Sequence, residues 1–244
     1  MRIMTRNFKP TFDVLKAFKE LSIDDLTFRF DTQGFRVKSA DRGMTSYLDA
    51  YFKASGFDEF EANNEILTVS LFNFLDFTFN KTDRITISNF GNFLTLKAES
   101  DTVTNLSLPL LENPTDNTEA IKIDTIKIDS SLIELDFKAF KTILKNYLKE
   151  DSVIFEIKEF NFGISTDRGQ ETKVFKGTDI IKEIGGKAKS KYSMGYLKLL
   201  NKLDIKTFST IKIEFKSDFP AIFTLQNDNI KLEYVVAPKV VDNE

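Results

Sequence analysis

Hydrophobic positions recur at helical spacing between residues 136 and 149. At about 100° per residue, one side carries the apolar residues Phe137, Phe140, Ile143, Leu144, Tyr147 and Leu148. A stripe of four lysines runs beside this face and contains no acid: Lys138, Lys141, Lys145 and Lys149. Like charges at this spacing repel each other by roughly 0.2–0.5 kcal/mol, so the stripe has an energetic cost. One interpretation is an ordinary lysine-rich surface, and the sharper one is a helix that faces a polyanion.

The same periodicity predicts an alternation of helices and strands along the whole chain. Helices are predicted at 9–21, 71–79 and 193–203 as well as 136–149. Strands are predicted at 26–30, 34–40, 47–52, 65–69, 84–88, 93–98, 152–157, 162–166, 171–175, 210–216, 221–226 and 230–236. A glycine- and lysine-rich stretch at 185–191 predicts a flexible basic loop.

The second half of the chain repeats the first at an offset of 126 residues. The matches are Asp24-Asp25 with Glu150-Asp151, Lys19 with Lys145, Ile85 and Ile87 with Ile211 and Ile213, and the Ser-x-Asp-Arg-Gly turns at 39–43 and 165–169. A repeat of this length predicts two like domains, at 1–107 and 130–244. The linker between them, 108–129, carries two of the five prolines.

Composition excludes several kinds of chemistry. The chain has 244 residues, 25 phenylalanines and a formal charge of −3, so the lysine stripe belongs to an otherwise acidic protein. It has no Cys and no His, which excludes disulfides, Cys/His zinc sites, thiol nucleophiles and a histidine base. No apolar run approaches the roughly 18 residues of a membrane span, and residues 1–10 lack a signal-peptide core. We therefore expect an intracellular protein.

An enzyme is the alternative from a different functional class. A metal-dependent phosphodiesterase could use the acids Asp24, Asp25 and Asp41. These acids follow predicted elements, where acids commonly form turns, and the first pair recurs in the second half of the chain. We therefore assign them to turns and expect no metal site. The sequence also contains no phosphate-binding P-loop motif.

The repeated order of helix, hairpin, strands, helix and strands resembles the DNA sliding clamps of the proliferating cell nuclear antigen (PCNA) family. The closing runs DFPAIF at 218–223 and KLEYVVAPK at 231–239 are similar to the last strands and Ala-Pro-Lys ending of that family. Short turns at 39–41 and 56–58 are similar too. The resemblance implies an α+β protein with two tandem copies of the DNA-clamp (processivity-factor) fold. Antiparallel sheets would lie outside, and helices would line one face of a ring.

The resemblance also implies a function without catalysis or a cofactor. Three copies would form a homotrimeric ring around double-stranded DNA, bound without sequence specificity, and would act as a processivity factor. The expected clients are a DNA polymerase, a clamp loader, a ligase and nucleases of replication and repair. The expected location is the DNA, in the cytoplasm of an archaeon or the nucleus of a eukaryote or its virus. The alternatives are a subunit of a heterotrimeric or checkpoint-type clamp that does not self-assemble, and a monomeric scaffold for client peptides.

Three sets of residues follow from the resemblance. The DNA-facing set is Lys9, Lys16, Lys19, Lys138, Lys141, Lys145, Lys149, Lys198 and Lys202. The partner-peptide pocket is Ala40, Met44, Ile121, Ile123, Pro220, Val235, Ala237 and Pro238, for each of which core packing is the other interpretation. The subunit interface pairs the edge strand with Val103, Leu106 and Leu108 to the edge strand with Lys173, Val174 and Phe175.

One departure from the family pattern concerns charge. The predicted helix at 71–79 offers Asp76, and only Lys81 follows it. The positive lining is therefore uneven, and either the DNA tilts toward the second domain or a differently charged sister subunit completes the ring.

Overall fold

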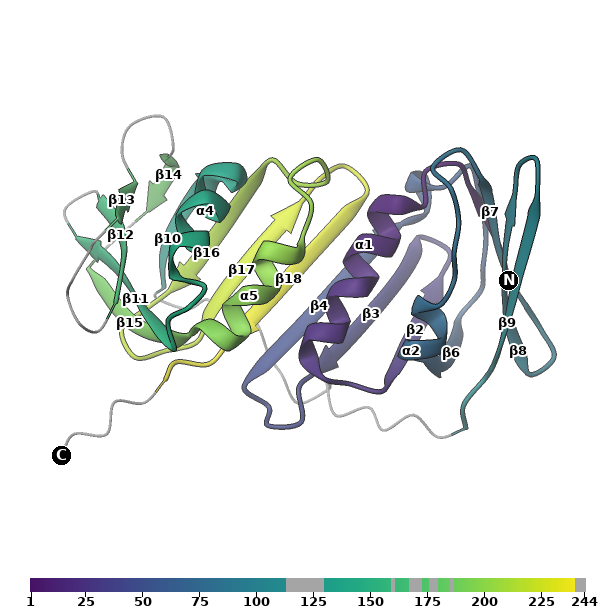
Figure 1. Ribbon diagram of the computed structural model, residues 1–244, viewed down its shortest axis with the longest axis horizontal. Coiled ribbons are helices and arrows are strands. Elements are labelled where there is room, and N and C mark those ends of the chain that lie inside the picture. Colours follow the sequence, from purple (N-terminus) through teal and green to yellow (C-terminus); the bar gives the residue numbers. More distant parts are fainter. Residues whose placement is uncertain (113–129, 159–160, 167–172, 176–179, 185–186, 240–244) are drawn as a thin grey trace. The chain divides into compact units, whose positions relative to one another are not determined.

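The computed structural model describes residues 1–112, 130–158, 161–166, 173–175, 180–184 and 187–239 (Figure 1). The chain divides into two compact units. Unit 1 consists of Met1–Arg42, Leu48–Thr118 and Asp228–Lys231, and unit 2 of Gly43–Tyr47, Glu119–Asn227 and Leu232–Glu244. None of the described helices is long and apolar enough to cross a membrane.

Unit 1 contains two groups of strands and two α-helices. Its elements in chain order are β1 (Arg2–Thr5), α1 (Lys9–Ala17), η1 (Phe18–Leu21), β2 (Asp25–Asp31), β3 (Gly34–Ala40), β4 (Ser46–Lys53, of which 46–47 fall in unit 2), η2 (Ala54–Gly56), β5 (Glu59–Glu61), β6 (Glu65–Ser70), α2 (Leu71–Leu75), β7 (Arg84–Phe90), β8 (Phe93–Glu99) and β9 (Val103–Pro109). The strand orders are β5-β1-β7-β8-β9 and β4-β3-β2-β6.

Unit 2 repeats this arrangement. Its elements are β10 (Ser131–Asp136), α4 (Phe137–Leu144), η3 (Lys145–Tyr147), β11 (Ser152–Lys158), β12 (Asn161–Ser165), β13 (Lys173–Phe175), β14 (Ile180–Ile184), β15 (Ala188–Ser193), α5 (Met194–Lys202), β16 (Thr210–Phe215), β17 (Ala221–Gln226) and β18 (Ile230–Val236, of which 230–231 fall in unit 1). The strand orders are β14-β10-β16-β17-β18 and β13-β12-β11-β15.

The two topologies correspond strand by strand, which confirms the predicted tandem repeat. In each unit the first strand lies beside the strand that follows the second helix, as β1 pairs with β7 and β10 with β16. The second helix also begins in the same way: the N–H of Leu71 donates to the carbonyl of Asp24 at 2.8 Å, and that of Met194 to Asp151 at 3.0 Å. Asp24 therefore corresponds to Asp151, one residue farther along than the offset that the sequence indicated.

Phenylalanine rings pack the helices against the strands within each unit. In unit 1 the ring of Phe74 on α2 lies 5.8 Å from Phe12 on α1 and 5.6 Å from Phe28 on β2. In unit 2 the ring of Phe140 on α4 lies 6.4 Å from Phe155 on β11. Full burial of such a side chain contributes about 1.5–3 kcal/mol, so these contacts determine which helix face is left for solvent.

The predicted elements agree with the structure except in a few stretches. The predicted helix at 71–79 ends at Leu75, and the strands β1, β5, β10 and β14 were not predicted. The predicted loop at 185–191 is wrong over its second part, since β15 begins at Ala188. Ser190 and Tyr192 alternate inward and pair with β11, and the lysines between them obscured this alternation in the sequence. Residues 185–186 lie outside the described part of the chain.

Candidate nucleic-acid and partner surfaces

Helix α4 forms because its N-terminus is capped by a side chain and its apolar face is buried. The N–H of Ala139 donates to the Asp136 carboxylate at 2.7 Å, which satisfies a backbone group at the helix start. Phe137, Phe140 and Leu144 are buried, and the helix lies against β10 and β16. The opposite face is left for the lysines, which accounts for the exposure of Lys138 and Lys145.

Lys141 is held differently from the other lysines of α4. Its ammonium group donates a hydrogen bond to the carbonyl of Leu203, the residue that ends α5, and lies 5.4 Å from the Phe137 ring centroid. Burial lowers the pKa of Lys141, and repulsion from Lys145 lowers it further, while Asp204 opposes both. Lys141 therefore links α4 to the end of α5 instead of presenting a free cation.

Helix α5 lies beside α4 in unit 2 (Figure 1). It presents a second cationic face. Leu197 and Leu200 are buried, whereas Lys198 and Lys202 are exposed one turn apart. Neither α4 nor α5 contains an acid. Lys149 is also exposed, just after η3, but the exposed acids Glu150 and Asp151 follow it directly.

The helices of unit 1 carry less positive charge. Lys9 on α1 forms an ion pair with Asp13 at 2.6 Å, so its charge is locally neutralised. Lys16 and Lys19 are exposed, and Glu20 is exposed beside them. Helix α2 exposes Phe72 and Asn73 and contains no lysine. The predicted uneven distribution of charge between the two helix pairs is therefore present in the structure.

Two segments of unit 2 that carry predicted partner-peptide residues contact each other. The N–H of Ala237 donates to the carbonyl of Thr45 at 2.8 Å, which places the end of β18 beside Met44. Met44 is 48% exposed, and its backbone lies in the left-handed region with φ of 53°. Ala237, Pro238 and Pro220 are partly exposed, whereas Val235 is buried, as its core-packing interpretation requires.

Three residues of the predicted pocket are not placed beside the others in unit 2. Ile121 and Ile123 lie outside the described residues, and Ala40 belongs to unit 1. Phe219, which was not among the predicted residues, is 36% exposed and has the Lys216 ammonium 3.9 Å from its ring centroid. Its sequence context, Asp218-Phe-Pro, signals a turn, but nothing in the sequence distinguishes an exposed phenylalanine from the many buried ones.

The two predicted edge strands stand at the ends of their strand orders among the described residues. β9 ends one order of unit 1, and its Val103 is 57% exposed. β13 ends one order of unit 2, and its Val174 is 38% exposed. Leu108 and Phe175, in contrast, are buried in their own units, so their side chains do not face a partner. Leu106 is partly exposed on β9, and Lys173 is partly exposed on β13.

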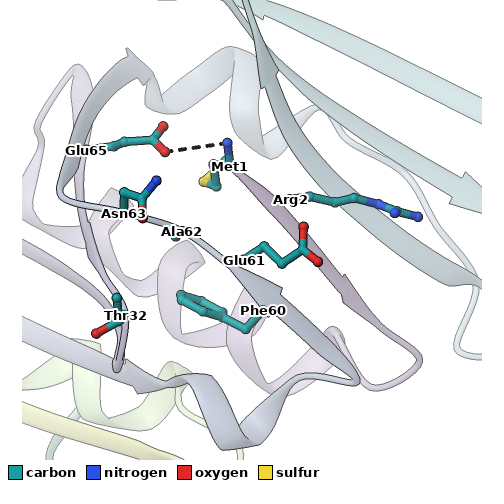
Figure 2. A pocket seen from close by; sticks show the side chains of 8 residues that line it. All are labelled: Met1, Arg2, Thr32, Phe60, Glu61, Ala62, Asn63 and Glu65. Carbon is teal, nitrogen blue, oxygen red and sulfur yellow. Dashed lines mark ion pairs between the residues drawn. The ribbon is translucent and has the colours of Figure 1, made fainter.

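A cavity of about 410 Å³ in unit 1 has none of these residues in its lining (Figure 2). It is lined by Met1, Arg2, Thr32, Phe60, Glu61, Ala62, Asn63 and Glu65. The Met1 amino group donates to Asn89 at 2.8 Å and lies 3.4 Å from the Glu65 carboxylate. These contacts hold the start of β1 in place beside the cavity.

One of the acids considered for a phosphodiesterase, Asp24, joins separate segments of unit 1. The carboxylate of Asp24 accepts a hydrogen bond from Arg42 at 2.8 Å, and its carbonyl accepts the N–H of Leu71 at the start of α2. Burial raises the pKa of Asp25, and the charge of Asp24 raises it further. Within the described residues, no group of three or more acids is arranged to hold a metal ion.

Comparison with known proteins gives one clear result. The sequence matches no protein-family model and no curated protein. Its structure is similar to that of a PCNA2–PCNA3 complex from Sulfolobus tokodaii, with a TM-score of 0.87, 19% identity and coverage of 98% of this chain and 99% of that one. It is also similar to a proliferating cellular nuclear antigen from Entamoeba histolytica, with a TM-score of 0.83, 14% identity and 98% coverage of both chains. Over nearly its whole length, the chain therefore has the fold of the PCNA sliding clamps.

Proposed function

We propose that this protein is a sliding clamp subunit that forms a ring around duplex DNA and tethers replication and repair enzymes to it. The observation that carries the proposal is the helix pair α4 and α5, which exposes lysines and contains no acid on a clamp fold. Exposed lysines at solvent-separated distances attract phosphates without reading bases, so the ring can move along DNA. The domains in this proposal keep the predicted bounds, 1–107 and 130–244, with the linker at 108–129.

A bead-tethered linear duplex tests encirclement directly. The protein is added while one DNA end is free, the end is then blocked by a bulky protein in half of the sample, and both halves are washed in salt. Encirclement predicts retention only on the blocked duplex, because a ring slides off a free end and salt screens its phosphate contacts. Equal retention on both duplexes would mean ordinary binding and would overturn the proposal.

The proposed ring has two candidate subunit compositions, a homotrimer and a heteromer. A homotrimer requires the exposed edges of β9 and β13 to pair between copies, and three chains of 28.0 kDa would give a native mass of 84 kDa. A heteromeric ring is favoured by the weak positive charge of α1 and α2, which a more basic sister subunit would offset. A native mass of 28.0 kDa for the isolated chain would support the second answer.

The client-binding surface of this proposal is the exposed part of unit 2 around Met44, Pro220, Ala237 and Pro238. A short client segment with apolar and aromatic side chains would dock there, in the groove-binding mode of peptide recognition. Ala237→Glu together with Pro238→Glu should abolish capture of a polymerase-derived peptide and leave the native mass unchanged. Undiminished capture by this variant would place the client site elsewhere.

A further inference from the structure

Five lysines of unit 2 lie on three segments that contact one another. They are Lys187 and, on β15, Lys189 and Lys191, with Lys216 after β16 and Lys239 after β18. The N–H of Lys189 donates to the Ser217 hydroxyl at 3.1 Å. The N–H of Lys239 donates to the carbonyl of Lys191 at 2.8 Å. The backbone therefore gathers these lysines on one surface, although they are far apart in the sequence.

The two lysines of β15 point away from the core. Ser190 and Tyr192, which alternate with them, are buried, and successive side chains of a strand face opposite sides. The hydroxyl of Tyr192 donates to the carbonyl of Phe219 at 2.8 Å, so the strand also holds the turn between β16 and β17 in place.

Exposed apolar side chains share this surface with the lysines. The Lys216 ammonium lies over the ring of Phe219, which leaves the rest of that ring accessible. Residues 237–239 connect this region to Met44, because the N–H of Ala237 binds the carbonyl of Thr45. Met44 is half exposed in a backbone conformation that residues other than glycine seldom adopt, and such positions concentrate where proteins bind partners. A flexible methionine also adapts well to varied partners.

The charge of the surface indicates the chemistry of its occupant. Among the described residues of these segments and of β11, the exposed or partly exposed acids are Asp218 in the β16–β17 turn and Glu156, which faces Lys189 across β11 and β15. The chain as a whole has a formal charge of −3, so this surface is more positive than the protein on average. Exposed apolar residues among the lysines favour a peptide over a nucleic acid, whose backbone offers phosphates alone to such a surface.

We infer that this lysine-rimmed surface selects client segments whose aromatic anchor is flanked by acidic residues. The inference rests on the proposed client-binding function and adds the charge of the client. The lysines attract the flanking carboxylates, while Phe219, Met44 and the neighbouring prolines contact the anchor. The contribution of the lysines is mainly electrostatic, so it weakens with salt.

Three labelled peptides with the same pair of phenylalanines test the inference. Their flanks consist of glutamate, glutamine or lysine, and binding to the full-length protein is measured by fluorescence anisotropy at low and high salt. We expect the affinity order glutamate, glutamine, lysine, with the differences shrinking at high salt. In a variant with Lys189→Gln, Lys216→Gln and Lys239→Gln, the acidic peptide should bind about two- to fourfold more weakly per lysine removed. Lys206→Gln, which removes an exposed lysine elsewhere in unit 2, should leave its affinity unchanged.

The outcomes separate this inference from the function on which it rests. Equal binding of the three peptides, abolished by Ala237→Glu, would overturn the charge selection and leave the client surface standing. Binding of none of them would overturn the client surface itself, whereas retention on end-blocked DNA reports on the ring independently. Displacement of the acidic peptide by a short duplex would show a nucleic-acid surface and would also overturn the inference.

Discussion

Lys141 and Lys145 lie one turn apart on the same cationic stripe, yet the structure predicts different effects on DNA binding when each is replaced. The ammonium group of Lys141 is engaged by the Leu203 carbonyl, whereas Lys145 is exposed. Lys141→Gln and Lys145→Gln remove the same charge and leave a side chain of the same type. We therefore expect Lys145→Gln to weaken DNA binding more than Lys141→Gln does.

The size of the difference follows from counterion release. Each lysine that neutralises a phosphate contributes about −0.9 to the slope of log affinity against log salt concentration. Lys145→Gln should reduce the magnitude of this slope by about 0.9 for each copy of α4 that contacts DNA. Lys141→Gln should change it by less than about half as much, because its ammonium already has a partner and its pKa is lowered by burial.

Anisotropy of a labelled linear duplex between about 50 and about 200 mM salt measures both slopes, because both ends of this duplex are open and a ring does not stay trapped on it. Lys206→Gln serves as the control for the loss of an exposed lysine outside the two helices, and urea unfolding confirms that each variant is folded. Equal slope changes for the two variants would show that Lys141 leaves Leu203 to meet DNA. An unchanged slope in Lys145→Gln would refute the assignment of the whole stripe to DNA.

Three further predictions concern the cap, the edges and the core. Asp136→Ala should lower the free energy of unfolding by about 1 kcal/mol in urea titrations, whereas Asp136→Asn should largely keep it, because Asn also caps a helix start. If the isolated chain has the 84 kDa mass of a homotrimer, Val103→Lys and Val174→Lys should each lower it by charging an exposed edge strand. An unchanged mass would exclude these edges as subunit contacts. Burial raises the pKa of Tyr192, so the folded state retains that proton more tightly and stability should fall as pH rises above about 10. Tyr192→Phe should remove that part of the decline, as shown by urea midpoints at about pH 9 and about pH 11, and an identical decline would refute it.

Local periodicity was sufficient to predict the helices and strands whose apolar residues recur regularly within a short stretch. The stripe of α4, the helix at 193–203 and the alternating strands near the chain end all lie close to their predicted bounds, because each is specified by neighbours within one or two turns. The strand β10 was missed, since it leads directly into Asp136 and α4 with no turn residue between them. The strand β15 was missed because lysines at alternate positions resemble a basic loop.

Contacts between residues far apart in the sequence decided which of the predicted side chains are exposed to a partner and which are engaged within the protein. The partner of Lys141 is a carbonyl at residue 203, and periodicity on one helix cannot distinguish it from its neighbours. Phe219 is exposed because Tyr192, on another strand, holds the turn that carries it. Leu108 and Phe175 alternate with exposed residues on their strands, and only the packed sheet shows which of the two faces is inside.

The sequence by itself determined that this protein has two similar halves, a cationic helix in an acidic chain and none of the cysteine or histidine chemistry of many enzymes. Those properties depend on residue types and short spacings. Only the tertiary structure decided which lysines are exposed, which apolar residues reach the surface and which lysine lies over the ring of Phe219. Such properties depend on backbone hydrogen bonds between segments far apart in the chain, and no local pattern of residues encodes them.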